Sequence, residues 1–182
     1  MTRIMRDSTD PSAIPMHGTD IVAGYVNGAF AWGPEGFGRF PGIPHVRIDV
    51  FATDPEHAGV LDVEPGCSTV EQSVVWAKQR KTAHPHWYPP IIYCNRSTLT
   101  PLFNAMNAAG LQVVRDFRLW IATLDGTKRV PDMTGVTAVQ YKRAPNEKKD
   151  GTPAEPPSAS VTAGHYDESI VYDDHWHRPA PG

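Results

Sequence analysis

The sequence Gly59-Val60-Leu61-Asp62-Val63-Glu64-Pro65-Gly66 is an apolar run that ends in two carboxylates and a Pro-Gly break. On a β-strand, side chains two positions apart face the same side, so Asp62 and Glu64 point the same way at the end of the strand. Two acids on an apolar face are costly to bury without a partner or a chemical role. Because a loop follows at once, we expect them to line an opening, where paired carboxylates are the usual apparatus of glycoside hydrolysis. The competing interpretation is that one carboxylate pairs with an arginine or caps the next helix.

The composition is that of a folded globular chain. It has 182 residues, of which 40% are hydrophobic and 20% charged, and this suits one domain over residues 1–182 with a sizeable core. The net charge of −3 and the lack of a basic stripe argue against a nucleic-acid partner. No apolar run approaches the roughly 20 residues of a membrane span. Residues 1–7 also lack the apolar core of a signal peptide.

Hydrophobic alternation and turn residues divide the chain into short strands and two clear helices. Ser68-Thr69-Val70-Glu71 predicts a capping box at the start of the first helix, and Thr100-Pro101 starts the second. The stretch 143–164 is rich in Pro, Lys, Glu, Ser and Ala and is typical of a mobile excursion. The predicted strands are 3–6, 21–26, 45–51, 59–64, 90–94, 117–122, 136–141 and 166–172, and the predicted helices are 69–80 and 100–109.

This order of elements predicts an α/β fold. Buried apolar strands that alternate with helices indicate a parallel sheet, and eight of them indicate closure into a barrel. Residues 52–58 are too few for a full crossover helix, and the later connections are also too short for one. We therefore expect a reduced TIM-type barrel, with its site at the carboxyl ends of the strands.

Several side chains allow two interpretations. Asp49 could belong to a site, although our default for an isolated strand acid is a partnership with Arg47 on the same face. Residues 29–42 form an aromatic, Gly-rich segment that we expect to pack over the core, whereas Trp32 and Phe30 could instead offer a stacking surface beside a site.

Two cysteines are too few for a disulfide framework, so Cys67 and Cys94 are either one isolated disulfide or two free thiols. The pairs His84-x-His86 and His175-x-His177 could bind a metal, but in Pro-rich loops such pairs are more often solvated. We expect neither a metal nor another cofactor.

Taken together, these segments resemble family 25 glycoside hydrolases, the Chalaropsis-type lysozymes. Gly59–Glu64 resembles their Asp-x-Glu strand, and the likeness is greater to the family 25-like proteins of actinobacteria and their phages. Other segments agree in the same order along the chain: Ile21–Tyr25, Pro90–Asn95, Leu119–Ala122, Val139–Tyr141 and Tyr166–Ser169.

The resemblance implies a (β/α)5(β)3 barrel that cleaves peptidoglycan between N-acetylmuramic acid and N-acetylglucosamine. It implies that Glu64 is the general acid and that Asp62 stabilises the developing positive charge or orients the substrate acetamido group. The first-strand acid would fall on Asp7, with Asp10 as the other candidate, and the last-strand acid on Asp167. The groove would be lined by Tyr25, Tyr93, Trp120 and Gln140.

The chemistry needs one carboxyl that stays protonated near neutral pH, and burial and a neighbouring anion both raise the pKa of a carboxyl. We expect Glu64 beside Asp62 to experience both effects. Strand residues two apart are separated by about 6.6–7 Å, between the retaining and inverting carboxylate separations, so both outcomes stay open. An acetamido group that attacks the sugar carbon would give retention.

Two functions remain open at this stage. The first is a lysozyme-like muramidase, and the second is a non-catalytic carbohydrate-binding or virion structural protein that keeps the barrel. Without a recognisable leader, we expect the protein to be cytoplasmic until released, or virion-associated, and to reach the cell wall through a phage virion or a holin.

Overall fold

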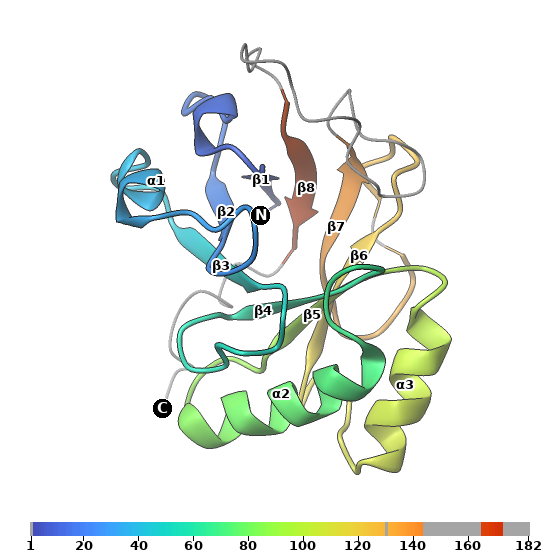
Figure 1. The fold of residues 1–182 in the computed structure, drawn as a ribbon. Helices are drawn as coiled ribbons and strands as arrows, with labels where there is room; N and C mark the ends of the chain where they lie inside the picture. Colours follow the sequence, from blue (N-terminus) through green and yellow to red (C-terminus); the bar gives the residue numbers. More distant parts are fainter. Residues whose placement is uncertain (1, 130, 144–164, 173–182) are drawn as a thin grey trace.

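A computed structural model describes residues 2–129, 131–143 and 165–172. Eight strands form a closed barrel in chain order, which confirms the predicted reduced TIM-type α/β barrel (Figure 1). The strands are β1 (Arg3–Asp7), β2 (Ile21–Tyr25), β3 (His45–Asp49), β4 (Val60–Val63), β5 (Ile91–Asn95), β6 (Arg118–Ala122), β7 (Val136–Lys142) and β8 (Asp167–Val171).

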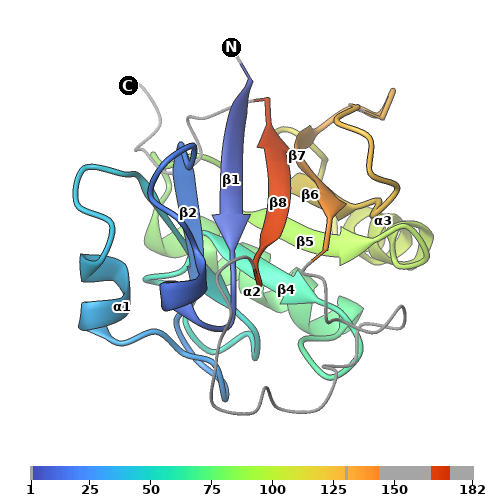
Figure 2. The same cartoon turned by 90° about the horizontal axis from the view of Figure 1, so that it is seen from above.

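The strands β1 to β7 are parallel to their neighbours, whereas β8 is antiparallel to both β7 and β1. Figure 2 shows β1 and β8 side by side with opposite directions. The prediction of a parallel sheet is therefore wrong for the last strand. This reversal brings the first residue of β8, Asp167, to the end of the barrel where β1 finishes with Asp7.

Only two long helices accompany the barrel in the described ranges, α2 (Val70–Ala83) and α3 (Leu99–Ala108). They lie together beside β4, β5 and β6, while the short α1 (Pro34–Gly38) and the 3-10 turn η1 (Pro11–Ala13) lie beside the first strands (Figure 1). The capping box forms one residue later than predicted, between Thr69 and Gln72. Ser68 does not cap the helix, because its hydroxyl donates to the carbonyl oxygen of Val50 at 2.9 Å.

Alternation along the strands sorts the apolar side chains into two layers. In β4, Val60 packs inside the barrel and Leu61 packs outside, against the layer that includes Trp76 of α2. The same alternation continues past Leu61, so the side chain of Asp62 turns inward and that of Val63 outward. The pleat of one short strand thus directs a carboxylate into the barrel mouth.

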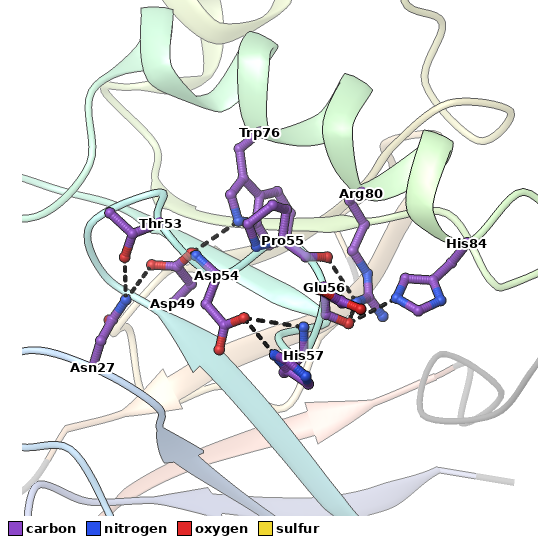
Figure 3. A network of polar contacts seen from close by, with 10 residues as sticks. All are labelled: Asn27, Asp49, Thr53, Asp54, Pro55, Glu56, His57, Trp76, Arg80 and His84. Carbon is purple, nitrogen blue, oxygen red and sulfur yellow. Dashed lines mark hydrogen bonds and ion pairs between the residues drawn. The ribbon is translucent and has the colours of Figure 1, made fainter.

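The connection between β3 and β4 is organised by Asp49, which is fully buried. Its carboxylate accepts hydrogen bonds from the side chains of Asn27 and Trp76 at 2.7 and 2.9 Å (Figure 3). It also accepts from the backbone N–H groups of Phe51 and Asp54. The predicted pairing with Arg47 is wrong, because that guanidinium lies over the ring of Phe37.

No helix within the described part of the chain is long and apolar enough to cross a bilayer.

Candidate active site

A pocket of about 320 Å³ opens at the carboxyl ends of the strands. It is lined by strand ends and by the loops that follow them, as the barrel architecture predicts. All eight residues that sequence reasoning singled out lie around this pocket: Asp7, Tyr25, Asp62, Glu64, Tyr93, Trp120, Gln140 and Asp167.

The four acids come from two sides of the mouth. Asp62 ends the inward row of β4 and Glu64 follows the strand, while Asp7 and Asp167 are register partners across β1 and β8. Directly opposite residues of an antiparallel pair share a face, so Asp7 and Asp167 present their carboxylates on the same side. Asp10, the other candidate for the first acid, instead caps η1 by accepting from the N–H of Ser12.

Asp62 is the carboxyl in the most unusual environment. It is 7% exposed, and one of its oxygens, Oδ1, has no hydrogen-bond partner within the described structure. Burial raises the pKa of Asp62 to about 8, the charge of Glu64 adds to this rise, and a hydrogen bond from the Cys67 thiol opposes it. Asp62 therefore carries a proton at neutral pH, and its Oδ1 is buried without a hydrogen-bond partner among the described residues.

A hydrogen-bonded chain crosses the floor of the pocket. The phenol of Tyr93 donates to the side-chain oxygen of Gln140, whose amide nitrogen donates to Asp167. Burial, followed by the charges of Glu64 and the other pocket acids, raises the pKa of Tyr93 well above its usual value. The phenol thus remains a donor, and its direction fixes the orientation of the Gln140 amide.

Trp120 forms the aromatic wall beside this chain. Its indole N–H donates to the hydroxyl of Ser169 at 3.0 Å, and its ring meets the Tyr93 ring edge-on at 4.9 Å between centroids. Trp120 is almost fully buried and packs in the inner layer of the barrel, and it also lines the pocket.

The aromatic segment after β2 divides into a core part and a pocket part. Trp32 is buried between Phe37 and Phe40, as expected for a packed loop, and its indole N–H donates to the carbonyl of Ser8. Phe30 is 47% exposed at the pocket edge, and Phe51, which sequence reasoning did not single out, is 49% exposed there.

The structure decides between the two alternatives for the cysteines and corrects the position of Arg143. Cys67 lines the pocket and Cys94 packs in the outer layer, and both are free thiols. Arg143 was assigned to the excursion 143–164 but belongs to the pocket wall; residues 144–164 lie outside the described residues. The only signal that could have placed Arg143 is its position directly after the strand that carries Gln140.

No metal-binding group of three or more His, Cys, Asp or Glu side chains occurs among the residues that the structure describes. The Nε2 atom of His84 lies 2.7 Å from the carbonyl oxygen of Glu56, and its ring stacks on Trp87. The pair His175-x-His177 lies outside the described residues. The pocket lining offers carboxylates, phenols, amides, aromatic rings, the Cys67 thiol and the Arg143 guanidinium.

Fold and site together define a reduced α/β barrel whose mouth holds acids on two opposite sides. Among solved structures, the chain is similar to a family 25 glycosyl hydrolase from Bacillus anthracis, with a TM-score of 0.52 and 12% sequence identity. The likeness covers 94% of this chain and 89% of that chain, and at this identity it establishes a shared fold. No family model matches the sequence. No curated protein matches it either.

Proposed function

We propose that this protein is a glycoside hydrolase that cleaves peptidoglycan, of the N-acetylmuramidase or lysozyme type. The observation that carries the proposal is the buried, protonated Asp62 beside Glu64 at the mouth of the barrel. Glycosidic bonds are cleaved by a pair of carboxyl groups of which one stays protonated near neutral pH. The fold shared with a family 25 glycosyl hydrolase supports the same class of reaction.

In this proposal Glu64 is the general acid that protonates the departing sugar oxygen. Glu64 is only partly buried, so a bound glycan can reach it, whereas Asp62 lies deeper. Near neutral pH the free protein keeps a proton on Asp62. The two carboxyls interact electrostatically, so they titrate as a coupled pair, and binding of a neutral sugar can shift the proton between them.

Asp62 has a second role in the same step. Its Oδ1 has no partner within the described residues and can bind the N–H of a substrate acetamido group. An acetamido group held there can attack the sugar carbon from within the substrate and give retention of configuration. Proton NMR of the first-formed anomer tests this step, because an inverted product excludes it.

The remaining pocket residues would hold the glycan. Asp7 and Asp167 face the pocket from the side opposite β4, where they can accept hydrogen bonds from sugar hydroxyls. Tyr25 and Trp120 would contact sugar rings, and the Tyr93–Gln140 pair would fix a hydrogen-bonding edge. The exposed rings of Phe30 and Phe51 would extend the groove at its rim.

The test is digestion of purified peptidoglycan, with actinobacterial walls first because the sequence resembles proteins of actinobacteria and their phages. We expect release of soluble muropeptides, and mass spectrometry after borohydride reduction should find N-acetylmuramic acid at the reducing ends. Reduced N-acetylglucosamine at these ends would instead show that the protein cleaves the other glycosidic bond of the glycan strand. Binding to walls without release from any wall type would support the non-catalytic carbohydrate-binding or virion alternative.

A further inference from the structure

A second pocket lies at the opposite end of the barrel from the acids. Its volume is about 400 Å³, and it opens where β3 and β4 begin, with the end of α2 and the loop before β5 as its other walls. We call it the basic pocket, and its polar and aromatic lining consists of His45, Arg47, Glu56, His57, Arg80, His84 and Trp87.

Arg80 is a buried cation whose hydrogen bonds go to main-chain carbonyls, while the charge of Asp54 acts on it from a distance beyond that of an ion pair. It is 6% exposed, and its Nη1 donates to the carbonyl oxygens of Pro55 and Glu56 at 3.0 and 2.9 Å (Figure 3). Its guanidinium also lies over the ring of Trp87 at 5.2 Å. No carboxylate of the described residues lies within ion-pair distance of it, and burial lowers the pKa of Arg80 to about 10. The group remains charged at neutral pH and leaves Nε and Nη2 for a ligand in the pocket.

A second arginine lines the same space. Arg47 is exposed, lies over the Phe37 ring at 5.2 Å, and forms no ion pair with any residue in the described part of the chain. Two guanidinium groups that both lack carboxylate partners and line one cavity are a recurring arrangement for oxyanions, because each presents a planar fork of donors.

The rest of the lining leaves this positive charge in excess. Glu56 is the one acidic residue in the described lining, and it contacts Arg80 and His84 through its main-chain carbonyl. The His84 and His45 rings each place Nε2 against a carbonyl oxygen, so Nε2 carries the proton and Nδ1 becomes a further donor whenever the ring is protonated. Within the lining, two arginines face one glutamate, and Asp54, which pairs with His57 beside the lining, also acts on Arg80.

We propose that the basic pocket binds a phosphate group, held between Arg47 and Arg80. Trp87 is 44% exposed beside them, and it offers a surface for the organic part of a phosphate ester. The volume of the basic pocket exceeds that of a phosphate ion, which favours an ester such as a sugar phosphate. This inference concerns different residues from the proposed hydrolase site and does not depend on it.

The test is a titration of the 15N-labelled protein, followed by NMR at the arginine Nε–H and tryptophan indole N–H groups. Inorganic phosphate is the first probe, and glucose 6-phosphate against glucose distinguishes an ester from the free ion. Sodium chloride keeps the ionic strength constant. We expect saturable shifts at Arg80 and Trp87 with both phosphate probes, and none with glucose. Saturable shifts that chloride alone reproduces, or none with phosphate, overturn the proposal.

Matched variants locate the ligand. Arg47→Gln should weaken phosphate binding by about tenfold or more, because a charge-assisted pair of hydrogen bonds is lost. Arg39→Gln is the control, since Arg39 is also exposed but lies outside the pocket. Arg80→Lys keeps the charge and removes the fork, and its folding is checked by circular dichroism. If Arg80→Lys does not fold, the comparison of Arg47→Gln with Arg39→Gln by itself decides whether phosphate binds in the basic pocket. Equal binding by Arg47→Gln and Arg39→Gln overturns the proposal, as does loss of binding in Glu64→Gln.

Discussion

The two ends of the barrel carry opposite charges, although β3 and β4 contribute to both. β3 places His45 and Arg47 in the basic pocket and Ile48 at the acidic mouth. β4 places Val60 in the basic pocket and Asp62 at the mouth. The two pockets therefore present different side chains at opposite ends of the same strands, and we expect them to bind different ligands.

The connection 50–59 joins the two ends. Its first residues, Val50 and Phe51, line the mouth, and its later residues, Glu56 and His57, line the basic pocket. Asp49 holds this connection at its start by accepting from the backbone N–H groups of Phe51 and Asp54, and it ties the connection to the side chains of Asn27 and Trp76. A change at Asp49 should therefore disturb both ends, whereas a change within one pocket should affect that pocket alone.

The largest effect on stability should come from Asp49→Ala, which removes the acceptor of four hydrogen bonds, although the Asn27 amide keeps the hydroxyl of Thr53 as a second acceptor. We expect a loss of about 3–5 kcal/mol in the free energy of unfolding by urea titration. The control is Asp54→Ala in the same loop, where a partly exposed pair with His57 should contribute less than about 1 kcal/mol. Similar losses in both variants would contradict the role given to Asp49.

The next effect is the pH dependence of stability that the buried Asp62 causes at the mouth. Burial raises the folded-state pKa of Asp62 from 3.8 to about 8, so the folded protein keeps a proton that the unfolded chain releases. This contribution favours folding fully below pH 3.8 and is lost as the pH rises to about 8. In the wild type the free energy of unfolding should therefore fall by on the order of a few kcal/mol between pH 3.8 and about 8, and in Asp62→Asn this fall should be smaller. An unchanged pH profile would contradict the buried proton.

A smaller effect distinguishes the aromatic groups of the two ends. Phe51→Ala should raise the KM for peptidoglycan by about two- to tenfold with little change in kcat, because a stacking contact is lost. Trp87→Ala removes an equally exposed ring at the basic pocket and should leave the KM unchanged. A KM that rises equally in both variants would mean that the rim does not contact the glycan.

The smallest effect lies away from both ends. Val114 has a φ of 76°, a left-handed conformation that β-branched residues rarely adopt. Asparagine tolerates this conformation, so Val114→Asn should raise the free energy of unfolding by about 0.5–1 kcal/mol without changing hydrolysis. Val75→Asn, at an exposed helical position, is the control and should bring no gain. A destabilised Val114→Asn would show that its side-chain packing outweighs the backbone strain.

Local patterns predicted the elements and the place of Asp62 and Glu64 at the mouth, whereas the other mouth residues were assigned through the family resemblance. Alternation and Pro/Gly breaks mark strands and their ends, and residues at the carboxyl ends of barrel strands converge on one mouth. The direction of β8 could not be predicted from the sequence, because side-chain alternation is the same whichever way a strand runs. Asp167 was still assigned to the mouth through the family resemblance.

Long-range partnerships were the part that sequence reasoning missed. Asp49 binds Asn27 and Trp76, which lie 22 and 27 residues away, so no local spacing could reveal them. The basic pocket draws its side chains from β3, the following loop and the end of α2, where isolated Arg and His residues have the pattern of a solvated surface. Only the folded arrangement brings them to one cavity.

The most direct test of the central claim is the release of reducing muropeptides by the wild type, Glu64→Gln and Glu71→Gln under one set of conditions. Glu71 lies in the first turn of α2, outside the mouth, and controls for the loss of one carboxylate. We predict release by the wild type and Glu71→Gln, and a fall of about a hundredfold or more for Glu64→Gln. Undiminished release by a folded Glu64→Gln would contradict the assignment of the acid pair as the catalytic centre.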